Sequence, residues 1–251
     1  MHFSDLPSEM LELIFSFVDN QTIFVLPRVC SSWRRICKLL TIQQIKWRDC
    51  FIHIDNFISM FERFKSIKSL SFESSKEDYV FKMHGVLTDK QFSRIVEEDF
   101  DFNFTDLESL HLPFVKISDE SIIKMIKNFK NLKDITLSWS YEISSDGILQ
   151  MIQSYPNLRS LKLERVAMDK RILLEIANCT ELRQLSLNDC HCLSDSELFK
   201  IMEKCKELIS LNLKDSEIQL DITNSVFNFF EYIKKKSLCK KLKEFEFGQS
   251  S

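Results

Sequence analysis

The chain has 251 residues, of which 44% are hydrophobic, and its formal net charge is −3. This length suits one or two domains. The weak net charge gives no reason to expect nucleic acid as a partner, because such proteins usually carry a basic face. Residues 1–10 lack the basic and apolar regions of a signal peptide, and no segment approaches the roughly 18 uninterrupted apolar residues of a membrane helix. We expect a soluble protein of the cytoplasm or nucleus, without a membrane partner.

The first fifty residues predict a small helical unit. Pro7 suits the first position of a helix, and residues 8–18 then form a helix that is apolar on two sides. These sides carry Met10, Ile14 and Phe17, and Leu11, Phe15 and Val18. A second helix is expected over about 28–40, where one stripe holds Val29, Trp33, Ile36, Cys37 and Leu40. Fifty residues are too few to cover both sides of the first helix, and an exposed apolar patch normally marks a protein interface.

From residue 64 onward, one apolar spacing occurs seven times. Each copy begins with an aromatic or cysteine residue, here called the anchor, and continues with apolar residues three, six and eight positions later. The copies are Phe64-Ile67-Leu70-Phe72, Phe104-Leu107-Leu110-Leu112, Phe129-Leu132-Ile135-Leu137, Tyr155-Leu158-Leu161-Leu163, Cys179-Leu182-Leu185-Leu187, Cys205-Leu208-Leu211-Leu213 and Cys239-Leu242-Phe245-Phe247. The last two positions of each copy face the same side of a short strand. Most anchors follow one another at the roughly 20–29 residues typical of leucine-rich repeats.

Apolar residues between the strands recur in helical register. The sets are Ile122/Ile126/Phe129, Ile148/Ile152/Tyr155, Ile172/Ile176/Cys179 and Leu198/Met202/Cys205, and each ends at the next anchor. This spacing places each set on one side of a helix. Ser194 with Glu197 resembles a capping box, Ser118 or Asp119 can cap a second helix, and we expect Asp146 to cap a third. The sequence therefore predicts a solenoid of strand–helix units.

Two of the units are longer than the others. Residues 73–103 hold an insertion that we interpret as a polar loop followed by a short helix, because Thr88 with Gln91 resembles a capping box. An extended helix is expected near 223–236. A basic cluster lies at the end of this segment. It is either a localisation signal or a binding site for an acidic partner, or it is a solvated helix end, where positive charge is favourable. Its members are Lys234, Lys235, Lys236, Lys240, Lys241 and Lys243.

The positions of the eight cysteines argue against a disulfide framework. Three of them stand at anchors, where free cysteine behaves as a compact hydrophobe: Cys179, Cys205 and Cys239. Cys190 and Cys192 with His191 could contribute to a metal site, but zinc normally takes four ligands and no second pair stands at a suitable spacing. No nucleophile, base and orienting group occur together either. We therefore expect no metal, no cofactor and no catalytic residue, with an enzyme using the Cys190–His191 neighbourhood as the least favoured alternative.

The other strand side chains point to the opposite, concave face of the sheet. This mixed-polar face excludes neither a folded partner nor a phosphorylated peptide. Trp139 and Arg165 follow the strands at equivalent positions of adjacent copies, and Trp and Arg are enriched among binding hot spots. Alternatively, Trp139 packs against the following loop with Tyr141. The candidate partner-binding residues, which would be substrate-binding if the partner is a substrate, are His111, Thr136, Trp139, Lys162, Glu164, Arg165, Gln184, Asn188, Asn212 and Lys214.

Two runs in the first fifty residues resemble the F-box family: Leu6-Pro7-x-Glu9-Met10-x-x-x-Ile14-Phe15 and Val29-Cys30-x-x-Trp33. The step from Val18 to Val29 also fits that family, and Trp47 stands where many F-boxes close. Two departures are Ser31, which replaces a usual basic residue, and Pro27, which leaves the start of the third helix open. The repeats likewise resemble the cysteine-containing leucine-rich type that often follows an F-box.

The resemblance implies an F-box leucine-rich-repeat protein, a non-catalytic substrate receptor of an SCF ubiquitin ligase. The F-box would bind a Skp-type adaptor that links it to a cullin, and the repeats would hold a protein substrate. By this resemblance, the residues that would bind the adaptor are Leu6, Pro7, Met10, Ile14, Val29, Cys30 and Trp33. Trp33 could equally belong to the core of the F-box. The alternative function is a scaffold that binds partners without promoting ubiquitin transfer.

These expectations define an α/β chain. A three-helix F-box occupies residues 1–48, a linker 49–60, and a leucine-rich-repeat solenoid 61–251. The solenoid has about seven strand–helix units and a curved parallel sheet.

Overall fold

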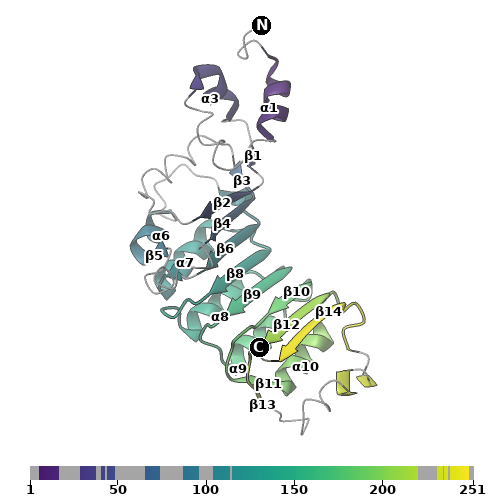
Figure 1. The fold of residues 1–251 in the computed structure, drawn as a ribbon. Coiled ribbons are helices and arrows are strands. Elements are labelled where there is room, and N and C mark those ends of the chain that lie inside the picture. Colours follow the sequence, from purple (N-terminus) through teal and green to yellow (C-terminus); the bar gives the residue numbers. More distant parts are fainter. Residues whose placement is uncertain are drawn as a thin grey trace.

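The computed structural model of the chain describes residues 6–16, 29–37, 41–42, 44–48, 66–73, 87–95, 104–113, 115–219, 231–233, 235–236 and 238–248. Its main feature is a sheet of eight parallel strands in the spatial order β14-β12-β10-β9-β8-β6-β4-β2. Strands that follow one another along the chain are therefore neighbours in space. The helices between them lie on one face of the sheet, and the described segments leave the other face open (Figure 1). This is the leucine-rich-repeat solenoid that the sequence predicts.

The elements are short, as the repeat length requires. The strands of the large sheet are β2 (Ile45–Arg48), β4 (Ser69–Glu73), β6 (Ser109–Pro113), β8 (Asp134–Ser138), β9 (Ser160–Glu164), β10 (Gln184–Ser186), β12 (Ser210–Lys214) and β14 (Glu244–Gly248). The helices beside it are α6 (Asp89–Ile95), α7 (Asp119–Asn128), α8 (Ser145–Ser154), α9 (Lys170–Ile176) and α10 (Asp195–Lys204). Three two-stranded ladders join β1 (Thr41–Ile42) to β3 (Ser66–Ile67), β5 (Leu87–Thr88) to β7 (Val115–Lys116), and β11 (Leu193–Ser194) to β13 (Ile218–Gln219). None of the described helices is long and apolar enough to cross a membrane.

The predicted repeat positions form the core of the solenoid. In register across the sheet, Leu110 lies opposite Ile135, which lies opposite Leu161, and the row continues through Leu185 to Leu211. All five side chains are buried, because the crossover helices cover the face of the sheet to which they point. The phase of the repeat is therefore confirmed. The final copy is less covered, since Leu242, Phe245 and Phe247 are only partly buried at the end of the array.

The cysteine anchors pack as predicted and also use their thiols. The Sγ of Cys205 donates to the carbonyl oxygen of Cys179 at 3.3 Å, and the Sγ of Cys239 donates to that of Met202 at 3.2 Å. Met202 lies in the last turn of α10, where a helix leaves its last carbonyl groups without intrahelical partners. A small side chain that both fills space and donates suits this position, and the aromatic anchors Phe104 and Phe129 instead make an edge contact at 4.9 Å.

The helix starts differ in part from the prediction. Ser118 is the N-cap of α7, as expected, but its hydroxyl donates to Asp89. The N-cap of α8 is Ser144 and not Asp146, because the Ser144 oxygen accepts the backbone N–H of residue 146 at 3.2 Å. The short helix predicted after residue 88 is present as α6, whereas most of the predicted helix at 223–236 lies outside the described residues.

Strand β2 is an eighth strand that the sequence analysis missed. Trp47 pairs with Phe72, and Ile42 of β1 pairs with Ile67. These contacts show that the run Leu39-Ile42-Ile45-Trp47 has the spacing of the repeat, with a leucine as its anchor. A search limited to aromatic and cysteine anchors overlooks it. The sheet therefore begins ahead of the predicted repeat domain, and the predicted linker at 49–60 lies outside the described residues.

The first turn of α10 holds a buried carboxylate, Glu197. Ser194 and Ser196 donate their hydroxyls to its Oε2, the latter at 2.7 Å, and the Nζ of Lys170 lies 3.1 Å from its Oε1. The Ser194 side chain caps no backbone N–H, so the predicted capping box is present in its residues but not in its usual bonding. Burial raises the pKa of Glu197, but the hydrogen bonds from Ser194, Ser196 and Lys170 outweigh it and hold the pKa at about 2.

Glu197 is expected to make stability depend on pH in the acid range. A carboxyl whose folded-state pKa is depressed stabilises the protein fully above its unfolded pKa, and this contribution is lost as pH falls through the folded pKa. With about 1.4 kcal/mol per pKa unit, the loss between about pH 5 and pH 2 is at most about 3 kcal/mol. Urea unfolding of the wild type and Glu197→Gln should therefore show a difference that shrinks as pH falls. A difference independent of pH would contradict the assignment, and Glu203→Gln, an exposed carboxylate of the same helix, is the control.

Candidate protein-interaction surfaces

The N-terminal helices form a small head at one end of the solenoid (Figure 1). Helix α1 spans Ser8–Ser16 and helix α3 spans Ser31–Cys37. The rings of Phe15 and Trp33 meet edge to face at 5.1 Å, and Leu11, Ile36 and Cys37 are buried beside them. The inner side of α1 is thus covered by its own chain. The described residues include two of the three predicted helices, and residues 17–28 lie outside the described part of the chain.

The outer side of the head remains apolar and open to water. Met10 is 51% exposed, Leu13 60% and Val29 56%. Exposed large apolar side chains in so small a unit indicate an interaction site. We call these three residues the head patch.

The predicted adaptor-binding residues fall into two groups. Pro7, Met10 and Val29 are exposed, whereas Leu6, Ile14, Cys30 and Trp33 are partly buried. Trp33 contacts Phe15, so it belongs at least in part to the core of the head. Leu13 was missed, although it stands three residues after Met10 and therefore on the same side of the helix.

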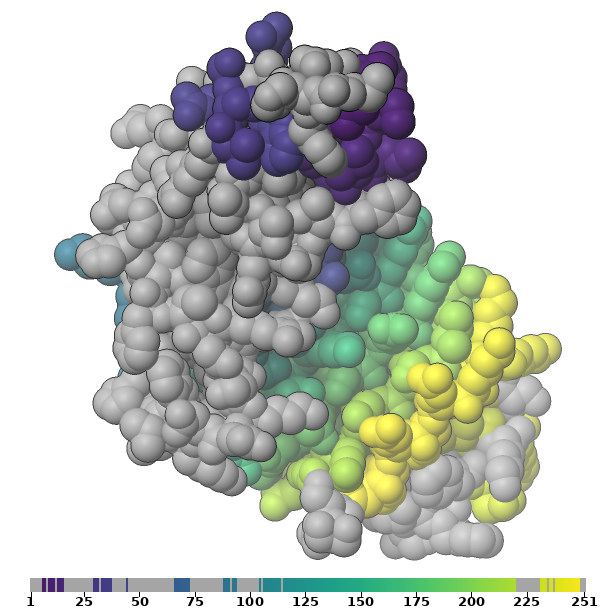
Figure 2. Space-filling view, turned by 45° about the horizontal axis from the view of Figure 1, so that its top comes forward, coloured from purple at the N-terminus to yellow at the C-terminus, as the bar shows by residue number. Residues whose placement is uncertain are grey.

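The open face of the sheet carries the candidate substrate-binding residues of the strands. Lys162, Gln184 and Lys214 are exposed there, and His111, Thr136, Glu164, Asn188 and Asn212 are partly buried. The face is therefore polar and accessible, as predicted. In the space-filling view the head lies at the top, and strand β14 reaches the surface toward the opposite end (Figure 2).

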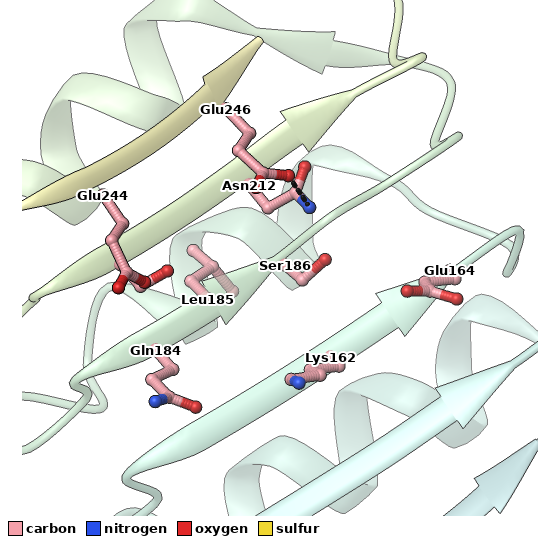
Figure 3. A pocket seen from close by; sticks show the side chains of 9 residues that line it. Lys162, Glu164, Gln184, Leu185, Ser186, Asn212, Glu244 and Glu246 are labelled. Carbon is pink, nitrogen blue, oxygen red and sulfur yellow. Dashed lines mark hydrogen bonds between the residues drawn. The ribbon is translucent and has the colours of Figure 1, made fainter. Parts of the chain in front are cut away.

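A hollow of about 230 Å³ interrupts this face between β9 and β14. Ser186 has a short side chain, and longer ones stand around it (Figure 3). The hollow is lined by Lys162, Glu164, Gln184, Leu185, Ser186, Ser210, Asn212, Glu244 and Glu246. Two of its carboxylates are oriented by neighbours, since Asn212 donates to Glu246 at 2.8 Å and Ser138 donates to Glu164 at 3.1 Å.

Trp139 and Arg165 lie together where the strands end. The Arg165 guanidinium stands 4.0 Å from the centre of the Trp139 ring, and its Nε donates to Asp189. Tyr141 contacts the Trp139 ring edge to face at 6.3 Å and is itself exposed. The Trp139 ring therefore packs on Tyr141, as the second alternative predicts, and it also contacts Arg165. We call Trp139, Tyr141, Arg165 and Asp189 the edge cluster.

The edge cluster stands on a left-handed turn that recurs from unit to unit. Trp139 has φ 59°, Arg165 48°, Asp189 52° and Asp215 59°. A bulky residue such as Trp rarely adopts this conformation, and a strained backbone of this kind costs about 1–3 kcal/mol. The turn gives these side chains fixed positions along the edge of the open face. Sequence spacing predicted the equivalence of Trp139 and Arg165 but not the bond to Asp189.

Cys190 lies away from any surface. Its Sγ donates to the carbonyl oxygen of Leu163 at 3.3 Å, and burial raises its pKa to about 12. The nearby His191 is exposed, with its Nδ1 3.6 Å from a Glu217 oxygen. Within the described ranges, no group of three or more His, Cys, Asp or Glu is placed to hold a metal ion.

This arrangement predicts a sharp order of thiol reactivity. The thiolate is the reactive form of cysteine, and Cys190 is both buried and protonated at neutral pH, whereas Cys192 is exposed. In the folded protein at pH 7.5, iodoacetamide followed by peptide mass spectrometry should label Cys192 and leave Cys190, Cys179 and Cys205 unlabelled until urea is added. Rapid labelling of Cys190 in the folded state would contradict its burial and revive a catalytic interpretation.

Residues 3–43 match the family model of the F-box domain. The match includes α1, α3 and the whole head patch. F-box domains typically bind Skp-type adaptors and are binding modules without catalytic activity. The exposed side of the head therefore coincides with a domain type whose role is to bind another protein.

Comparison with other proteins adds little beyond this domain. No curated protein matches the chain. Among solved structures, the chain is similar to an internalin C2 from Listeria monocytogenes, with 14% sequence identity, 89% of this chain and 77% of that chain covered, and a TM-score of 0.40. An internalin (inlF) from the same species shows 11% identity, coverage of 92% and 89%, and a TM-score of 0.26. Scores this low support no conclusion about function.

Proposed function

We propose that the chain is the substrate-recognition subunit of an SCF-type ubiquitin ligase. In this role the F-box binds a Skp-type adaptor, the adaptor connects it to a cullin, and the repeats hold a protein substrate. The observation that carries the proposal is the head patch, an exposed apolar surface within the residues that match the F-box domain. An apolar surface of this kind is stabilised when a second protein covers it.

The adaptor-binding surface in this proposal consists of the head patch and its neighbours. It contains Leu6, Pro7, Met10, Leu13, Ile14, Val29, Cys30 and Trp33. The partly buried members shape the surface from below, as the contact of Trp33 with Phe15 illustrates. The exposed members make the contact with the adaptor.

The substrate-binding surface in this proposal is the open face of the solenoid together with the edge cluster. Trp, Tyr and Arg are the residue types that most often dominate binding energy, and all three occur in the edge cluster. Their mutual contacts hold them in place before binding, which reduces the entropy cost of association. The subunit itself performs no chemistry: it raises the effective concentration of substrate near the activated ubiquitin. We place this activity in the cytoplasm or nucleus.

Co-expression with a Skp-type adaptor tests the proposal. The chain should co-purify with the adaptor as a 1:1 complex and should aggregate when expressed alone, because the head patch is then exposed. A chain that stays monomeric beside excess adaptor would overturn the proposal. Addition of a cullin to the complex separates a ligase subunit from a scaffold, since only the ligase subunit should join a cullin-containing assembly.

A further inference from the structure

The hollow on the open face is built by the alternation of long and short side chains. Neighbouring strands place Ser186 next to Lys162 on one side and next to Asn212 on the other, and Asn212 in turn lies opposite Glu246. The floor is therefore low at Ser186, and longer side chains stand on either side in the same row. Figure 3 shows Glu246 beside Asn212 and Glu244 apart from it, with Lys162 and Glu164 on the other side of the hollow.

The side chains that line the hollow carry more negative than positive charge. Its lining holds three carboxylates, Glu164, Glu244 and Glu246, and one ammonium, Lys162. Elsewhere on the solenoid, carboxylates form ion pairs: Asp189 with Arg165, Glu181 with Arg159 and Glu207 with Lys241. No ion pair among the described residues includes the three carboxylates of the hollow. Glu164 and Glu246 accept hydrogen bonds from the neutral donors Ser138 and Asn212.

We propose that this hollow receives a basic side chain, arginine or lysine, from an extended segment of a partner protein. Charge complementarity carries the proposal, because a cation placed beside Glu244 and Glu246 would pair with carboxylates that form no ion pair with any described residue. The inference deepens the proposed function by giving the chemical class of the segment that the repeats recognise. A phosphorylated segment is disfavoured, since its charge has the same sign as that of the hollow.

The spacing of the two glutamates on β14 also defines the partner. Glu244 and Glu246 are two residues apart on one strand, so their side chains emerge on the same face at a separation of roughly 7 Å. An extended segment has the same two-residue repeat. Two basic residues separated by one residue can therefore meet both glutamates at once.

Peptide binding to the full-length chain, with and without the Skp-type adaptor, tests the inference. The probes are fluorescein-labelled Ser/Gly peptides that differ only at two positions separated by one residue, occupied by arginine, lysine, glutamate or phosphoserine. Fluorescence anisotropy should show binding of the arginine and lysine peptides, with an affinity that falls as salt is added. The double substitution Glu244→Gln and Glu246→Gln should weaken this binding about fivefold or more, which corresponds to about 1 kcal/mol.

A matched pair of carboxylates outside the hollow provides the control. Glu203 and Glu231 are also exposed, and their double replacement by glutamine changes the net charge by the same amount, so the arginine peptide should bind this variant as it binds the wild type. Equal weakening in both double variants, or tighter binding of the phosphoserine peptide, would overturn the inference. Adaptor binding is scored in the same preparations. Its failure would remove the proposed function, whereas peptide binding alone decides the role of the hollow.

Discussion

Replacing Leu161 with alanine is expected to lower the free energy of unfolding by about 2–5 kcal/mol. The Leu161 side chain is fully buried in the middle of the solenoid, in register with Ile135 of β8 and Leu185 of β10. Truncation leaves a cavity that both neighbouring units line. In a solenoid each unit is stabilised mainly by its interfaces with the next, so the damage should spread in both directions along the sheet.

Urea unfolding measures the loss, and hydrogen exchange locates it. Amides of β8 and β10 should lose protection together with those of β9. Leu174→Ala is the control: this leucine lies on α9 and is 37% exposed, so its truncation should cost about 0.5 kcal/mol or less. A loss confined to β9, or a Leu161→Ala variant as stable as the control, would contradict the assigned register.

The repeat was predictable from sequence because its constraint is local and repeats many times. A side chain three, six or eight positions after an anchor has one allowed direction in a strand–helix unit, and the buried row from Leu110 to Leu211 follows that rule. The same rule does not predict how deeply side chains are buried at the ends of the array. Phe245 and Phe247 have the right spacing but are only partly buried, since burial there depends on whether another unit follows. Spacing alone carries no information about that neighbour.

Contacts between units account for most of the remaining differences. Asp119 accepts the backbone N–H of Ser144 at 2.8 Å, although the two residues are 25 positions apart. This contact holds Ser144 at the N-cap of α8, where local sequence alone favours Asp146 equally well. The edge cluster also depends on contacts between units, because Arg165 contacts Trp139 of one neighbouring unit and Asp189 of the other. A pattern read within one repeat predicts neither contact.

In the head, the pattern predicted two apolar sides of α1 but not which residues face water. Leu11 and Phe15 are buried, as one side of the helix requires, whereas Ile14 of the other side is partly covered and Leu13 is exposed. The position of α3 against Phe15 determines this rotation, through the ring contact with Trp33. The packing of the two helices was therefore needed to define which residues form the head patch. The small size of the unit was enough to predict that such a patch exists.

Charges placed in the head patch should abolish adaptor binding. In the double variant Met10→Glu and Val29→Glu, both side chains are already exposed in the free chain, so the substitutions should not unfold the head. Covered by an apolar partner surface, the same carboxylates would lose their hydration without compensation. We expect a loss of affinity for the Skp-type adaptor of about 100-fold, or about 3 kcal/mol, measured by titration with purified adaptor.

The matched control places the same charges elsewhere on the surface. Ile123 is 41% exposed and Leu174 37%, and both lie on helices of the solenoid, away from the head. Their double replacement by glutamate should leave adaptor affinity within about twofold of the wild type, because surface charges far from an interface affect binding only weakly. If the head variant binds the adaptor as tightly as this control while circular dichroism shows both to be folded, the adaptor must contact another part of the chain. The head patch would then require a different partner, since an apolar surface of this kind still calls for one.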